Sequence, residues 1–115
     1  MNGGDETWLQ ANGDTGEAGV TGLVSIVIPT WNRSALLRET LGAILAQAYR
    51  PIEVIVVDDD STDDTLAMVR GLAAEAPEGI QLSATHQEKA GGPAARNRGA
   101  RQSRGEFIVF MDDDD

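Results

Sequence analysis

Two runs of aspartate each follow an apolar, β-like stretch of the chain. Residues 54–57 lead into the aspartates at 58–60, and residues 110–111 lead into the aspartates at 112–115. In open α/β sheets, ligands bind outside the carboxyl ends of the strands. Adjacent carboxylates repel one another unless solvent or a cation lies between them. The sequence therefore predicts one shared site at a sheet edge, with a divalent metal as the first ligand to consider.

The spacing of the terminal run suits a hard cation. Asp112 and Asp114 are separated by one residue, so a loop after a strand could direct both carboxylates at one ion. Oxygen ligands of this kind favour Mg²⁺ or Mn²⁺, which proteins hold with one or two carboxylates plus substrate phosphates. A solvated acidic tail is the alternative. The direct continuation from an apolar strand favours the metal site.

The earlier run has both a structural and a functional interpretation. Ser61 and Asp64 have the spacing of a capping box and can cap a following helix. That role does not require Asp58 or Asp59. A carboxylate fixed at a strand end can accept a hydrogen bond from an imide N–H or a ribose hydroxyl. We expect at least one of these two aspartates to be functional.

The loop at residues 29–33 follows a buried strand, so its polar groups should face the same crevice. The structural alternative is that Pro29 ends the strand and that Asn32 or Ser34 caps the next helix. Trp31 could stack on a base or pack into the core. Taken alone, this loop is weak evidence for a site.

The glycine-rich segment at residues 91–99 matches neither a dinucleotide-binding fingerprint nor a phosphate-binding loop. Arg96 and Asn97 could face the site. The arginines at positions 98, 101 and 104 fit a solvated face better. His86 is the only histidine, and we expect it to have a structural role.

Alternating strands and helices are predicted to position these residues. Buried-strand patterns are expected at residues 23–28, 52–57, 80–85 and 106–111, and helical spacing at 34–49, 61–76 and 93–103. The order β-α-β-α-β-α-β with short connections predicts an α/β fold with one mostly parallel sheet and right-handed crossovers. Three helices would leave that sheet incompletely covered, so we expect a fragment of a larger domain.

Composition narrows the function classes. The net charge of −10 comes from 19 acidic and 9 basic residues, which argues against a nucleic-acid-binding surface. No run approaches the roughly 18 apolar residues of a membrane span, and cysteine is absent. Residues 1–22 lack the features of a signal peptide and are expected to be a disordered leader before a domain at 23–115. We expect a cytoplasmic protein, with any membrane association left to a longer parent chain.

Four blocks of the sequence together resemble the N-terminal half of a family 2 inverting glycosyltransferase with the GT-A fold. They are residues 24–33 (VSIVIPTWNR), 56–65 (VVDDDSTDDT), 92–97 (GPAARN) and 110–114 (FMDDD). The blocks occur in the order and at the spacing of that family. Jointly they are specific, although no single block would be, and they cover residues 23–115.

The resemblance implies a nucleotide site. Pro29, Thr30 and Asn32 would lie along the nucleotide, and Asp59 would accept the uracil imide hydrogen with support from Asp58. The donor would be a nucleoside diphosphate sugar, with a UDP-sugar favoured. Oligomeric state stays open.

The resemblance also implies a metal site for Mn²⁺ or Mg²⁺. The Asp-x-Asp motif would comprise Asp112 and Asp114 as metal ligands, Asp114 being the main one, with Asp113 near the ribose or the sugar. Arg96 and Asn97 would border the donor site.

Two departures from the family pattern matter. Position 60 is Asp where the family usually has Gly, although Asp visits left-handed conformations more readily than most residues. No residue here can be matched to the carboxylate base of an inverting transferase, so we expect that this chain alone does not transfer sugar.

Two alternatives remain. One is a non-catalytic truncated fragment that binds no ligand. The other is a Mg²⁺-binding signalling module similar to a receiver domain. A receiver has acids after its first and third strands, whereas here they follow the second and fourth, which argues against it.

Overall fold

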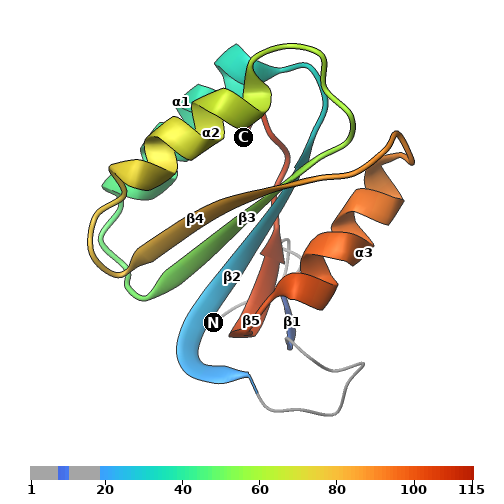
Figure 1. Cartoon of the computed structure of the whole chain (residues 1–115). Coiled ribbons are helices and arrows are strands. Elements are labelled where there is room, and N and C mark those ends of the chain that lie inside the picture. Colours follow the sequence, from blue (N-terminus) through green and yellow to red (C-terminus); the bar gives the residue numbers. More distant parts are fainter. Residues whose placement is uncertain (1–7, 11–18) are drawn as a thin grey trace.

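The computed structural model describes residues 8–10 and 19–115. Strands and helices alternate along the chain (Figure 1). The strands are β1 (Trp8–Gln10), β2 (Val20–Thr30), β3 (Ile52–Asp58), β4 (Ile80–His86) and β5 (Gly105–Phe110); the helices are α1 (Ser34–Ala46), α2 (Thr65–Ala74) and α3 (Gly92–Gln102). From β2 onward the order is the predicted one. No helix in the described ranges has the length and apolar character needed to cross a membrane.

The strands form one sheet in the order β1-β5-β2-β3-β4. Strands β5, β2, β3 and β4 are mutually parallel, whereas β1 pairs antiparallel with β5 at the edge. The predicted α/β fold with a mostly parallel sheet is therefore confirmed. The fifth strand, β1, was not predicted.

Helices α1 and α2 cover one face of the sheet, and α3 covers the other (Figure 1). Successive side chains of a strand point to opposite faces, so Ile26 and Ile28 of β2 join the cluster with α1 and α2, whereas Val27 points toward α3. Val54 and Val56 of β3 extend the first cluster. Each fully buried side chain of this size contributes roughly 2 kcal/mol to folding.

Helix α3 approaches the sheet closely at one glycine. A Cβ at Gly99 would lie 2.3 Å from Cγ1 of Val27 in β2, so no larger residue fits without a shift of the helix. This close packing fixes the position of α3 on the sheet. The first turn of α3 consequently lies near the ends of β2 and β3.

One prediction about β2 needs correction. Pro29 does not end it, because the ladder with β3 continues through Pro29 and Thr30. The carbonyl of Val27 accepts a hydrogen bond from the N–H of Met111, so the main-chain polar groups of Val27 face β5. Those of Pro29, two residues later, face the same side, but β5 has ended at Phe110. The missing N–H of proline therefore costs no ladder bond.

The predicted leader at residues 1–22 overlaps two strands of the structure. Trp8–Gln10 forms β1, and β2 begins at Val20 rather than at residue 23. Both stretches pair with β5, β1 in antiparallel and the start of β2 in parallel orientation. The rest of the predicted leader lies outside the described residues.

The second helix begins later than its capping-box pattern predicted. Helix α2 starts at Thr65, and Asp64 at its N-cap makes no side-chain capping hydrogen bond. The side chain of Asp63 caps the helix instead, because its carboxylate accepts hydrogen bonds from the N–H and the hydroxyl of Thr65.

Candidate functional site

The carboxyl ends of three parallel strands lie side by side. The register pairs Thr30 of β2 with Asp58 of β3, and Asp58 with His86 of β4. Strand β5 ends beside β2, where the N–H of Met111 donates to the carbonyl of Val27. The predicted shared edge is thus formed, with the loops after β2, β3, β4 and β5 around it.

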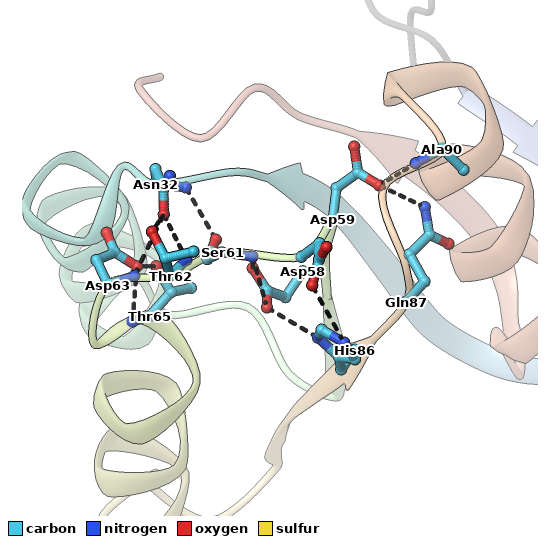
Figure 2. A network of polar contacts seen from close by, with 11 residues as sticks. Asn32, Asp58, Asp59, Ser61, Thr62, Asp63, Thr65, His86, Gln87 and Ala90 are labelled. Carbon is cyan, nitrogen blue, oxygen red and sulfur yellow. Dashed lines mark hydrogen bonds and ion pairs between the residues drawn. The ribbon is translucent and has the colours of Figure 1, made fainter.

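Asp59 is the most heavily bonded carboxylate of this edge. Its side chain accepts hydrogen bonds from Gln87 Nε2 (3.0 Å) and from the N–H groups of Ala90 (2.8 Å) and Gly91 (3.0 Å), and it lies 3.4 Å from Lys89 Nζ. Figure 2 shows the loop from β4 to α3 wrapped around it. Burial alone would raise the pKa of Asp59, but these donors outweigh burial and lower the pKa to about 2.

Asp58 supports the turn that carries Asp59. It is fully buried, it accepts a hydrogen bond from the N–H of Ser61 (3.2 Å), and its carboxylate lies 3.3 Å from Nδ1 of His86. Asp60 has φ 73°, a left-handed conformation that favours glycine. This explains why glycine would be usual at this position, and Asp adopts such a conformation more readily than most residues. His86 also lies 3.6 Å from the carboxylate of Asp60, so the only histidine braces the turn.

Asn32 ties the first loop to the second instead of capping α1. Its Oδ1 accepts from the N–H groups of Thr62 (2.8 Å) and Asp63 (3.3 Å), and its own N–H donates to Ser61 (2.8 Å) (Figure 2). The N-cap of α1 is Arg33, without a side-chain capping bond. Asn32 is therefore held in the β3–α2 turn, and its predicted contact with a nucleotide stays a prediction.

The terminal aspartates divide into one buried and three exposed carboxylates. Asp113 is 6% exposed and accepts hydrogen bonds from Thr30 Oγ1 (2.9 Å) and Arg33 Nη1 (3.0 Å). Each of the other three offers a carboxylate oxygen within 4.8 Å of the others; they are Asp112, Asp114 and Asp115. The predicted metal ligands Asp112 and Asp114 thus lie together, and Asp115 is a third candidate that the sequence did not single out.

Three residues of the site were missed by sequence reasoning. Arg33 pairs with Asp113 and lies 3.4 Å from Asp114, and its hydrogen bond to Asp113 raises its pKa above the ordinary value. Lys89 lies 3.8 Å from the ring centroid of Trp31. Gln87 binds Asp59 from a loop that has no motif of its own.

The predicted residues are divided between two hollows at this edge of the sheet. One, of about 240 Å³, is lined by Pro29, Thr30, Trp31, Arg33, Asp59, Lys89, Gly92, Ala95 and Asp113. The other, of about 550 Å³, is lined by Pro93, Arg96, Asn97, Phe110, Met111, Asp112 and Asp115. Arg96 and Asn97 therefore do border the exposed acids. One hollow thus holds Trp31 and Asp59, and the hollow beside it holds Arg96, Asp112 and Asp115.

Comparisons with known proteins identify a family to which the chain is similar. Residues 25–115 match the family described as "Glycosyl transferase family 2". A Campylobacter jejuni protein named GalNAc(5)-diNAcBac-PP-undecaprenol beta-1,3-glucosyltransferase is 37% identical over 92 residues, which cover 80% of this chain and 29% of that protein.

Two solved structures share the fold. TarS 1–349 of S. aureus, in complex with UDP-GlcNAc, superposes with a TM-score of 0.71 at 34% identity over 79% of this chain and 26% of that one. The mannosyltransferase PcManGT from Pyrobaculum calidifontis, in complex with GDP-Man and Mn²⁺, gives a TM-score of 0.67 at 36% identity, covering 79% of this chain and 27% of that one. The chain spans less than a third of the length of these relatives.

Proposed function

Because the chain belongs to glycosyl transferase family 2, we propose that it is the donor-binding part of a metal-dependent enzyme that transfers a sugar, with inversion, from a nucleoside diphosphate to an acceptor. The observation that carries the proposal is the pairing of the two hollows, one with Trp31 and Asp59 and one with Asp112 and Asp115. A nucleoside diphosphate has a ring at one end and a charged diphosphate at the other. Membership of this family also argues against the alternative that the chain is a receiver-like signalling module.

The smaller hollow is the proposed site of the base. A pyrimidine ring could stack on Trp31 and run along Pro29 and Thr30, and its imide N–H could donate to Asp59. The longest contact of that carboxylate is the 3.4 Å one to the exposed Lys89, which is the contact most easily given up to a ligand. This arrangement favours a UDP-sugar, with Asp58 holding the turn.

The exposed aspartates are the proposed cation site. Their donor set consists of oxygen atoms only, and it gathers three carboxylates within reach of one ion, which suits Mn²⁺ or Mg²⁺. Asp112 and Asp114 would hold the ion, with Asp115 beside them. The bound ion would offset the negative charge that builds on the leaving nucleoside diphosphate.

The wider hollow is the proposed site of the diphosphate and the sugar. Arg96 and Asn97 form one wall and could contact oxygen atoms of the donor, while Asp112 forms another. Without a cation, the acids would repel a diphosphate. An inverting transfer also needs a base that deprotonates the acceptor, and no residue here is assigned to that role. We propose that the base and the acceptor site belong to the part of such enzymes outside the match.

Calorimetric titration of the chain with UDP, with and without Mn²⁺, tests the proposal after circular dichroism has shown that the chain folds. We expect binding that requires Mn²⁺ and that Asp114→Ala abolishes. Asp64→Ala is the matched control, since it removes an exposed acid on the same side of the sheet. A folded chain that binds UDP in neither condition would instead support the ligand-free fragment.

A further inference from the structure

Asp113 differs from the acids on either side of it. It is 6% exposed, whereas Asp112, Asp114 and Asp115 are all exposed. Four identical residues in a row thus contribute one side chain to the interior and three to the surface. A buried carboxylate needs partners, because an uncompensated buried charge costs several kcal/mol.

The partners of Asp113 come from the end of β2, from the N-cap residue that precedes α1, and from α1 itself. Its Oδ2 accepts from the hydroxyl of Thr30 (2.9 Å), and its Oδ1 accepts from Nη1 of Arg33 (3.0 Å). The hydroxyl of Thr40, buried on α1, donates to the main-chain carbonyl of Asp113 (2.9 Å). Three bonds therefore fasten this one residue to β2, to α1 and to the N-cap between them.

This fastening determines where the neighbouring carboxylates can lie. Asp112 and Asp114 flank the fixed residue in the sequence. Each has a carboxylate oxygen within 4.8 Å of one from the other and of one from Asp115. Such a group of like charges is unfavourable by itself. Arg33 counters part of it, because the same nitrogen that binds Asp113 lies 3.4 Å from Asp114.

We propose that Asp113 is a positioning residue for the cation site: it neither binds the metal nor touches the sugar, but anchors the acidic loop to β2 and α1 so that the three exposed carboxylates converge. The inference rests on the proposed function, since it assigns a role within that metal site. It replaces the predicted contact of Asp113 with ribose or sugar. Both oxygens of Asp113 already accept bonds in a buried place, at 2.9 and 3.0 Å, and Asp113 lacks the longer lysine contact that Asp59 could give up to a ligand.

The test is the affinity of the chain for Mn²⁺ alone, measured from the signal of free Mn²⁺ in electron paramagnetic resonance. Asp113→Asn keeps the shape but loses the charge that holds Arg33, and we expect Mn²⁺ affinity to fall about tenfold, as when partners of metal ligands are removed. Thr40→Val removes only the bond to the main chain of Asp113 and leaves every charge in place. We expect a loss of about fivefold, the value of one hydrogen bond.

Glu53→Gln is the matched control. Glu53 is also 6% exposed, and it pairs with Arg104 and binds Ser25 at the opposite end of the sheet. This variant breaks the same kind of buried ion pair and should leave Mn²⁺ affinity unchanged. Urea unfolding of each variant shows how much stability has been lost.

The outcomes separate the possible failures. Weaker binding in both Asp113→Asn and Thr40→Val, with Glu53→Gln unchanged, supports the anchor. Loss in Asp113→Asn with no change in Thr40→Val would indicate a direct ligand and overturn it, and so would wild-type affinity in both. If Asp113→Asn does not fold, Thr40→Val decides alone. No Mn²⁺ binding by the wild-type chain would overturn the metal site itself, and the anchor with it.

Discussion

Asp58 and Asp59, at the end of β3, are buried among hydrogen-bond donors of the chain itself, whereas three of the four aspartates after β5 are exposed. Asp59 accepts from Gln87, Ala90 and Gly91 and has a pKa near 2. The exposed acids after β5 have Arg33 as a nearby cation, at 3.4 Å from Asp114. Two similar sequence patterns at one sheet edge are thus stabilised in opposite ways.

This difference fits the proposed function. A carboxylate that the protein itself surrounds is fixed before any ligand arrives, which suits the reading of a base by hydrogen bonds. A group of exposed carboxylates is unfavourable until a cation joins it, which suits a metal that arrives with the diphosphate. The first run should therefore matter for folding and the second for cation binding.

The largest expected effect is on folding. Asp59→Asn places an amide N–H₂ at a buried position among the N–H donors of Gln87, Ala90 and Gly91, so at least one of these donors loses its acceptor. We expect the free energy of unfolding to fall by about 3 kcal/mol, measured by urea denaturation. Asp60→Asn is the control, because Asp60 is exposed and Asn also accepts a positive φ. A loss no larger than that of the control would contradict the comparison.

The pH dependence should show the same contrast. The pKa of Asp59 is about 2 in the folded chain and near 4 in an unfolded one. A carboxylate whose pKa is lowered by folding stabilises the folded state at pH values above its pKa in the unfolded chain. This contribution is lost as the pH falls through its pKa in the folded chain. Between pH 5 and pH 2 the stability advantage of wild type over Asp59→Asn should shrink by roughly 2–3 kcal/mol. Urea titrations at several pH values would show it; a constant difference would argue against it.

The smallest effect is expected after β5. Asp112→Asn removes one of several exposed like charges, so the unfolding free energy should stay the same or rise by up to about 0.5 kcal/mol at low salt. Mn²⁺ binding should be lost in the same variant. Calorimetry with Mn²⁺ and urea denaturation check the two halves of this prediction. A clear loss of stability would mean that the exposed acids also hold the fold.

Much of this architecture could be predicted from local pattern. The apolar runs predicted the strands from β2 to β5, and the position of Asp58 and Asp112 directly after two of them predicted the shared edge. The alternation of elements predicted the parallel sheet. These features depend on periodicity and on residues adjacent in sequence, which a single chain displays.

The missed features depend on partners distant in sequence. Asp113 is buried by Thr30 and Thr40, which precede it by 83 and 73 residues, and four consecutive aspartates have no periodicity that marks one for the interior. Asn32 could cap α1 on local grounds, yet its side chain binds the turn thirty residues later. Tertiary competition of this kind decides the roles of polar residues and leaves no local signal.

The most direct test compares uridine and UDP as ligands of the wild-type chain, each titrated with and without Mn²⁺ and followed by NMR. If Asp59 and Trp31 read the base while the exposed acids hold the cation, uridine should bind weakly and equally in both conditions. UDP should bind at least about tenfold more tightly with Mn²⁺, a gain of about 1.4 kcal/mol. These separate roles would be contradicted if Mn²⁺ strengthened the binding of uridine as much as that of UDP, or strengthened the binding of neither.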